Sequence, residues 1–196
     1  MVTDPFDTSS VGLKFPSVSA NIVTVSHDHA DHNKAELVKD VGKVIKGPGE
    51  YEIGGVSLIG FQTYHDGERG KLRGKNTIYV IEIDDMRILH LGDIGHSLSE
   101  KMVEEIGDIY VLMIPVGGEY TVDAKEAIKI VSAISPKIVI PMHYQVSGLK
   151  KQAFAKLTTE EPFTKELGLL VEKTSKLSLK NMDLIEDQKL YVLEKK

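Results

Sequence analysis

The chain has 196 residues, a formal net charge of −5 and no cysteine, and its acidic and basic residues are mixed along the sequence. This length fits one domain, expected to span residues 1–196, that buries a sizeable core without disulfides. The lack of cysteine excludes thiolate nucleophiles and thiolate metal sites, so any metal must be bound by nitrogen and oxygen. There is no strong nucleic-acid signal, and no apolar run reaches the roughly 18 residues of a membrane span, so we expect a soluble cytoplasmic protein.

The first half of the chain predicts short strands and hairpins. Residues 1–6 resemble the end of a strand, residues 7–20 a loop, and the β-branched residues 22–25 a buried strand. Asn33 or Asp31 can cap a helix that runs to about residue 40. Turns at residues 54–55 and 84–85 predict two hairpins, with strands at 51–53, 56–64, 77–83 and 86–91.

The second half predicts alternating helices and strands. A helix capped by Ser99 is expected to reach residue 106, followed by an apolar strand at 109–116, a helix at 122–134 and a strand at 137–141. The last quarter predicts short helices at 150–157 and 164–170 and closing strands at 176–179 and 189–193. Hairpins followed by alternating helix and strand, with strands apolar on both faces, indicate an α/β protein in which two packed sheets are covered by helices.

A cluster of metal-ligand residues directly follows the strand at residues 22–25, with the sequence pattern His-x-His-x-Asp-His at residues 27–32. A surface loop rich in His and Asp is the alternative to a metal site. The metal site is favoured because three more residues of these types, His65, Asp93 and His143, each follow a predicted strand. Strand ends meet at one edge of a sheet, so these side chains are expected to converge. Seven ligands are too many for one tetrahedral ion and fit two ions that share a carboxylate.

In these motifs the chain resembles hydrolases of the metallo-β-lactamase fold. The matching stretches are residues 26–32, His65, residues 92–93 and residues 141–144, supported by residues 115–118 with Thr121. Within that superfamily the chain is most similar to the branch of the ascorbate-6-phosphate lactonase and the N-acylphosphatidylethanolamine phospholipase D. The resemblance implies a four-layer αββα sandwich of two mixed β-sheets. Family members begin with a hairpin before the stretch matched by residues 2–5, so we expect this chain to lack the first strand or hairpin.

The resemblance also implies a role for each site residue. His27, His29 and His65 would hold one metal ion, Asp31, His32 and His143 would hold the second, Asp93 would bridge them, and Asp4 would orient the histidines from behind. The ions would be zinc, with manganese or iron as alternatives. They would supply a metal-bound hydroxide that attacks a small ester, lactone or phosphoester, with Asp31 as the catalytic carboxylate.

Several roles stay open at this point. Gly118 and Tyr144 either contact substrate or form a plain turn and a packed aromatic, and the basic residues at positions 69, 71, 73 and 75 either bind an anionic substrate or are solvated. His90 is predicted to be structural, because its parity in the strand points it away from Asp93. The competing functions are a phosphodiesterase or nuclease of the same fold, and a metal-binding or di-iron redox protein without hydrolytic turnover. The expected partner is a small-molecule substrate, and a homo-oligomer is left open.

Overall fold

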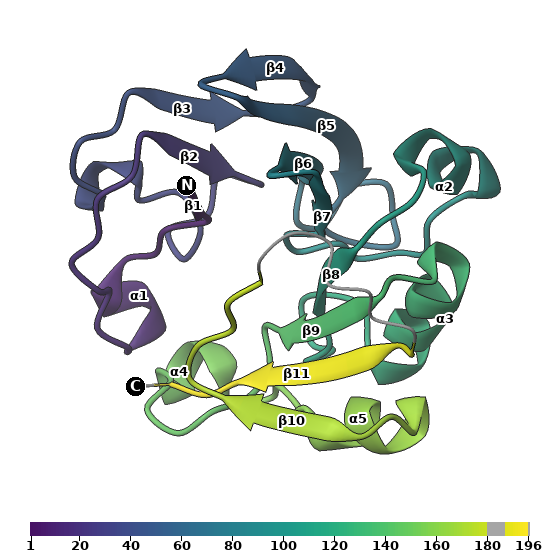
Figure 1. The fold of residues 1–196 in the computed structure, drawn as a ribbon. Coiled ribbons are helices and arrows are strands. Elements are labelled where there is room, and N and C mark those ends of the chain that lie inside the picture. Colours follow the sequence, from purple (N-terminus) through teal and green to yellow (C-terminus); the bar gives the residue numbers. More distant parts are fainter. Residues whose placement is uncertain (180–186, 196) are drawn as a thin grey trace.

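The computed structural model describes residues 1–179 and 187–195 and contains two β-sheets (Figure 1). Their strands are Val2–Thr3 (β1), Ile22–Val25 (β2), Lys43–Lys46 (β3), Gly49–Ile53 (β4), Val56–Tyr64 (β5), Lys75–Ile83 (β6), Met86–His90 (β7), Val111–Pro115 (β8), Ile138–Met142 (β9), Val171–Thr174 (β10) and Lys189–Leu193 (β11). The small sheet has the order β1-β2-β3 and is parallel throughout. The large sheet has the order β10-β11-β9-β8-β7-β6-β5-β4.

The helices are few and short. They are Thr8–Val11 (α1), the 3₁₀ helix Ala35–Leu37 (η1), Glu100–Ile106 (α2), Ala124–Ile134 (α3), Lys151–Phe154 (α4) and Glu161–Leu167 (α5). Ser99 caps α2 as predicted, because its side chain accepts a hydrogen bond from the backbone of Met102. None of these helices, over the residues that are described, is long and apolar enough to cross a membrane.

The large sheet is mixed because its strands arise in two ways. Strands β4 to β7 are antiparallel, and β4/β5 and β6/β7 are hairpins whose two-residue turns at Gly54–Gly55 and Asp84–Asp85 have positive φ angles, as tight hairpins require. The later strands β7, β8, β9, β11 and β10 are parallel, and helices lie in the connections from β7 to β8, from β8 to β9 and from β9 to β10. Strands β5, β7 and β9 therefore run in one direction, and their C-terminal ends share one edge of the sheet.

Three apolar layers hold these elements together. Ile22 and Ile45 of the small sheet pack against Leu58, Tyr79 and Ile81 of the large sheet. The other face of the large sheet packs against α2, α3 and α5, and α3 buries residues at helical spacing: Ala127, Ile130, Val131 and Ile134 (Figure 1). The outer face of the small sheet is covered by η1 and by the loop before β2. This arrangement confirms the predicted α/β fold with two sheets.

Three predictions about local structure are wrong, and one strand was not predicted. The helix expected to reach residue 40 is only η1, because the chain leaves it at Val38 in an extended conformation. Strand β3 was not predicted, since only Ile45 of its four residues is buried. The expected loop at 7–20 contains α1, which Asp7 caps. Residues 176–179 form no strand and pack on the core by Leu177 and Leu179, while β10 lies earlier in the chain.

Candidate metal centre

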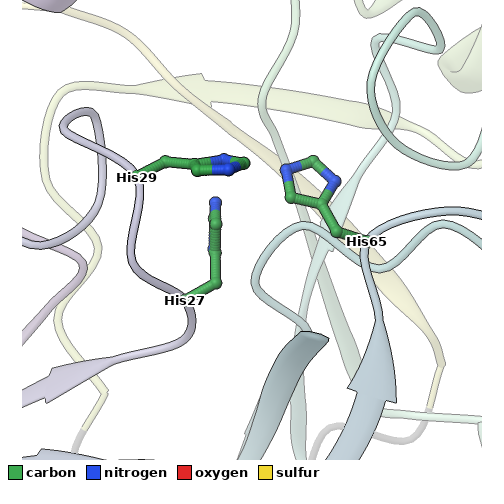
Figure 2. Close-up of side chains that lie close together, drawn as sticks. All are labelled: His27, His29 and His65. Carbon is green, nitrogen blue, oxygen red and sulfur yellow. The ribbon is translucent and has the colours of Figure 1, made fainter. Parts of the chain in front are cut away.

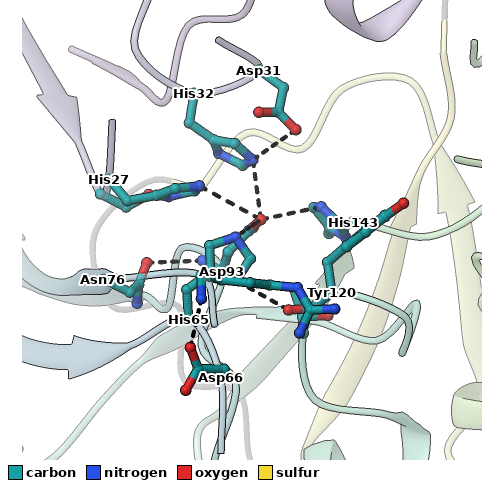
Figure 3. A network of polar contacts seen from close by, with 12 residues as sticks. His27, Asp31, His32, His65, Asp66, Asn76, Asp93, Tyr120 and His143 are labelled. Atoms are coloured by element: carbon teal, nitrogen blue, oxygen red, sulfur yellow. Dashed lines mark hydrogen bonds and ion pairs between the residues drawn. The ribbon is translucent and has the colours of Figure 1, made fainter. Parts of the chain in front are cut away.

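The predicted ligands come from loops that follow four strands. His27, His29, Asp31 and His32 lie after β2, His65 directly follows β5, Asp93 lies three residues after β7, and His143 directly follows β9. The shared direction of β5, β7 and β9 brings three of these loops to one edge of the large sheet, where they meet the loop from the small sheet. All seven predicted ligand side chains therefore lie in one cluster (Figures 2 and 3).

Three histidines form the first group of possible metal ligands. The rings of His27, His29 and His65 point toward one another, and one nitrogen from each lies within 4.8 Å of the others (Figure 2). Ring centroids are 4.6 Å apart for His27 and His29 and 5.1 Å apart for His29 and His65. His27 and His65 are buried, whereas His29 is exposed, so the group opens to solvent on one side.

A second group combines one carboxylate with two histidines. Asp31, His32 and His143 each offer an atom within 4.8 Å of the others. The rings of His32 and His143 are stacked with centroids 6.0 Å apart, and Asp31 Oδ2 lies 3.7 Å from His32 Nε2. All three side chains are half-buried.

Asp93 lies between the two groups and contacts both. Its Oδ2 atom lies close to four imidazole Nε2 atoms, at 3.2 Å from His65, 3.3 Å from His32, 3.3 Å from His143 and 3.8 Å from His27 (Figure 3). Asp93 is 2% exposed. One carboxylate oxygen thus faces histidines of both groups, which is the geometry expected of a ligand shared by two ions.

The outer ring nitrogens of three histidines are held by hydrogen bonds. His27 Nδ1 lies 2.9 Å from Ser26 Oγ, His32 Nδ1 lies 3.0 Å from Asp4 Oδ2, and His65 Nδ1 lies 3.0 Å from the Tyr120 carbonyl oxygen. Such bonds fix the orientation of each ring and leave Nε2 free to face the cluster. Asp4 also accepts a 2.7 Å bond from the Ser26 amide, which fits the orienting role that the resemblance implies for it.

Two buried polar side chains that the sequence did not single out support the cluster. Asn76, which is 0% exposed, accepts a 3.0 Å hydrogen bond from the Asp93 amide and donates to the Leu91 carbonyl and Thr63 Oγ1. Asp66 accepts four backbone amide bonds from residues 68, 70, 72 and 73 and so shapes the loop after His65. The one sequence signal for Asn76 is an asparagine at the start of a strong strand, where this residue type is disfavoured.

The charges of the cluster follow from burial and proximity. Burial would raise the pKa of Asp93, but the imidazoles of His143 and His32 hold that pKa well below its ordinary value. Burial would lower the pKa of His32, but the carboxylates of Asp93 and Asp4 raise it well above the usual range. Burial and the neighbouring His32 lower the pKa of His27 to about 3. His27 is therefore neutral at physiological pH, the state in which an imidazole binds metal.

The residues present fit divalent metal ions. His27 Nε2, which faces Asp93 Oδ2, is a buried atom without a hydrogen-bond partner among the described residues, and such an atom costs free energy unless something else binds it. A set of imidazole nitrogens and carboxylate oxygens suits zinc, manganese and iron. The candidate ligands thus have the right chemistry, and His27 provides an unpaired nitrogen that faces the cluster.

Gly118, Tyr144 and His96 all make contacts within the protein, and Tyr144 also lines a cavity together with His32, Asp93 and His143. Gly118 has a φ of 85° and starts a turn closed by a hydrogen bond from the Thr121 amide to its carbonyl. Tyr144 packs against the main core, and burial and the nearby carboxylate of Glu160 raise its pKa. His96 accepts a 3.1 Å bond from the Tyr64 amide.

The prediction that His90 faces away from the cluster is wrong. His90 is buried and lines the same apolar cavity as Asp4, His32 and Asp93. Strand parity fails here because β7 ends at His90, and Gly92, with a φ of 52°, turns the chain before Asp93.

Comparisons with known proteins agree with this geometry. A protein-family model described as a β-lactamase superfamily domain matches residues 1–143. A UPF0173 metal-dependent hydrolase of Thermococcus onnurineus is 30% identical over 171 residues, which cover 74% of this chain and 76% of that protein. A UPF0173 metal-dependent hydrolase of Methanopyrus kandleri is 28% identical over 202 residues, covering 88% and 86%.

A solved structure extends the similarity to nearly the whole chain. A protein of Thermotoga maritima, described as a candidate zinc-dependent hydrolase of the metallo-β-lactamase superfamily, is 36% identical and has a TM-score of 0.81. The match covers 98% of this chain and 88% of that one. The chain therefore belongs to the metallo-β-lactamase superfamily, as a metal-dependent hydrolase of the UPF0173 family.

Proposed function

We propose that this hydrolase works with two divalent metal ions, and that the ions are zinc, with manganese or iron as alternatives. The first ion would be held by His27, His29 and His65, the second by Asp31, His32 and His143, and Asp93 would bridge them. The observation that carries this proposal is the Asp93 Oδ2 atom, which lies within 3.8 Å of Nε2 atoms from both histidine groups. The zinc dependence named for the Thermotoga maritima protein supports the choice of metal.

When bound, the two ions supply an activated water at neutral pH and a Lewis acid for the carbonyl or phosphoryl oxygen of the substrate. The chain itself keeps its ligands oriented, through the outer hydrogen bonds of His27, His32 and His65. Asp31 is half-buried and lines the open cavity beside His29, His65 and Asp93. We assign Asp31 the role of orienting the attacking water and accepting its proton, which requires a carboxylate within reach of the reacting atoms.

The substrate in this proposal is a small ester, lactone or phosphoester. The cavity over the cluster has a volume of about 580 Å³, which suits a small molecule. The resemblance to the branch of the ascorbate-6-phosphate lactonase and the N-acylphosphatidylethanolamine phospholipase D supports lactones and phosphodiesters as the first compounds to test.

The test combines metal analysis with an activity panel. The purified protein is expected to contain two equivalents of metal and to hydrolyse at least one class among esters, lactones and phosphodiesters in a chelator-sensitive way. His65→Ala should lose the first ion and His143→Ala the second. Asp31→Asn should weaken binding of the second ion, because Asp31 is one of its ligands, and should remove the rise of activity with increasing pH that a carboxylate base provides. A panel that is active only on phosphodiesters would favour the phosphodiesterase alternative.

His96→Gln is the matched control, because this histidine lies near His65 in space but bonds backbone groups only. It is expected to retain both ions and the activity. A wild-type protein that binds a single ion, or a His143→Ala variant with unchanged metal content, would overturn the two-ion proposal.

A further inference from the structure

A second cavity adjoins the proposed metal centre and differs from it in charge. It has a volume of about 590 Å³, and His27 and His29 are among the residues that line it. Its charged lining consists of three cations, Lys46, Arg73 and Lys75, and a single carboxylate, Asp28. The cavity therefore has a positive charge although the chain as a whole carries a formal charge of −5.

Arg73 links this second cavity to the cavity over the metal centre, because it lines both. A substrate whose reacting group lies beside Asp93 can therefore extend past Arg73 toward Lys46 and Lys75. No described carboxylate, in residues 1–179 or 187–195, forms an ion pair with Arg73 or Lys75, while Lys46 lies 3.9 Å from Asp28. The two unpaired cations are available to a ligand.

The position of Arg73 is fixed by the surrounding structure. Its amide donates a 2.7 Å hydrogen bond to Asp66, the buried carboxylate that shapes the loop. Its guanidinium lies 5.4 Å from the ring centroid of Tyr120 and donates a 3.3 Å bond to the Glu119 carbonyl. A guanidinium held over an aromatic face loses little freedom when it binds an anion, and its planar fork matches carboxylate and phosphate oxygens.

The other basic residues of the same loop differ from Arg73 in their exposure and in their contact with the cavities. Arg69 and Lys71 are exposed and line neither cavity, whereas Arg73 is half-buried at the junction. Of the basic residues at positions 69–75, Arg73 is half-buried, and Lys75 lines the cavity although it is exposed.

We propose that Arg73, with Lys75 and Lys46, forms an anion-binding subsite that selects substrates carrying a carboxylate or phosphate on the part that does not react. This inference rests on the proposed function for the position of the reacting group. The positive cavity attracts the anion, and Arg73 then aligns it by two parallel hydrogen bonds, which places the scissile bond over the metal centre.

The kinetic test uses three aryl esters with one leaving group: 4-nitrophenyl butanoate, its ω-carboxylate analogue and its ω-phosphate analogue. In the metal-loaded protein, Arg73→Met is expected to raise KM for the two anionic esters roughly tenfold and to leave the neutral ester unchanged. Arg73→Lys keeps the positive charge but lacks the planar guanidinium, so its KM for the anionic esters should lie between those of the wild type and Arg73→Met. Arg69→Met is the matched control, because it removes the same group from the same loop at an exposed residue with positive φ. It should leave KM unchanged for all three esters.

A binding measurement separates this inference from the proposed reaction. Titration of the metal-loaded protein with inorganic phosphate should give an affinity that Arg73→Met weakens roughly tenfold and Arg69→Met leaves unchanged, with equal metal content in all variants. If no ester is hydrolysed but this binding pattern holds, the reaction class is wrong and the subsite stands. Equal effects of Arg73→Met on neutral and anionic esters, or unchanged phosphate affinity in this variant, would overturn the subsite.

Discussion

Asn76 joins the ends of three strands beneath the proposed metal centre, and replacing it tests whether this network supports the fold. Its side chain accepts a hydrogen bond from the Asp93 amide at 3.0 Å and donates to the Leu91 carbonyl at 3.0 Å and to Thr63 Oγ1 at 2.8 Å. Thr63 Oγ1 also donates to the Asn76 carbonyl, so it keeps a partner when the side chain is removed. Asn76→Ala therefore leaves two buried backbone groups unpaired.

The expected cost follows from those two groups. Each buried polar group left without a partner costs about 1–3 kcal/mol, so Asn76→Ala should lower the free energy of unfolding by roughly 2–6 kcal/mol. Because whole domains are stable by only about 5–15 kcal/mol, this is a large fraction of the total. Asn76→Asp keeps the acceptor for the Asp93 amide but places a second oxygen against the Leu91 carbonyl, so it should be destabilising as well.

Urea denaturation of the chelator-treated proteins measures this effect without a contribution from metal. Ser57→Ala is the control, because it removes an exposed side-chain bond to Glu52 in the same large sheet and should cost less than about 0.5 kcal/mol. A loss below about 1 kcal/mol for Asn76→Ala would refute the claim that the two backbone groups depend on Asn76.

Three further predictions concern the surroundings of the cluster. A Cβ atom on Gly117 would lie 2.1 Å from the His143 carbonyl oxygen, so Gly117→Ala should displace His143 and reduce bound metal from two equivalents to one by elemental analysis; unchanged metal would contradict this. Tyr79→Phe removes hydrogen bonds to two backbone carbonyls and should cost about 1 kcal/mol in urea denaturation; an equally stable variant would contradict it. In the metal-free protein, the raised pKa of His32 contributes stability that is present below about pH 6.5 and is lost as pH rises through the pKa of His32 in the folded state. The lowered pKa of His27, about 3, contributes stability that is present above about pH 6.5 and is lost on acidification toward pH 3. Unfolding free energies at pH 5, 6.5 and 8 should therefore peak near the middle value, and a steady rise or fall across this range would contradict the assignment.

Much of the fold was predictable because local signals and tertiary structure agree. The turns at Gly54–Gly55 and Asp84–Asp85 predicted both hairpins of the large sheet, and Ser99 predicted the start of α2. Strand β3 was missed because a four-residue strand with one buried side chain carries no detectable periodicity. The strand expected at residues 176–179 was wrong because alternating apolar residues there pack on the core without backbone pairing.

The gathering of the seven predicted ligands was also predictable, since strand ends at one edge of a sheet converge. Among the residues that hold those ligands in place, Asp4 was assigned an orienting role by the resemblance, but Asn76 and Asp66 were not predicted. Asn76 bonds to groups 13 to 17 positions away in the chain, and Asp66 becomes significant only because its loop folds back over it. His90 shows the same limit, because one glycine with positive φ cancelled an argument from strand parity.

The division between the two kinds of residue has a physical cause. Metal-ligand chemistry restricts a site to a few residue types, so His27 to His32 stand out in any sequence. Supporting hydrogen bonds accept almost any polar group at the right distance, and Asp4, Ser26, the Tyr120 carbonyl and Asn76 each do so here. Anion recognition by Arg73 lies between these cases, because the residue type was visible but its unpaired, half-buried position appeared only when the loop after His65 had been placed against Tyr120. Sequence therefore identifies the chemistry of this centre, while the fold decides which of the many charged residues around it can take part.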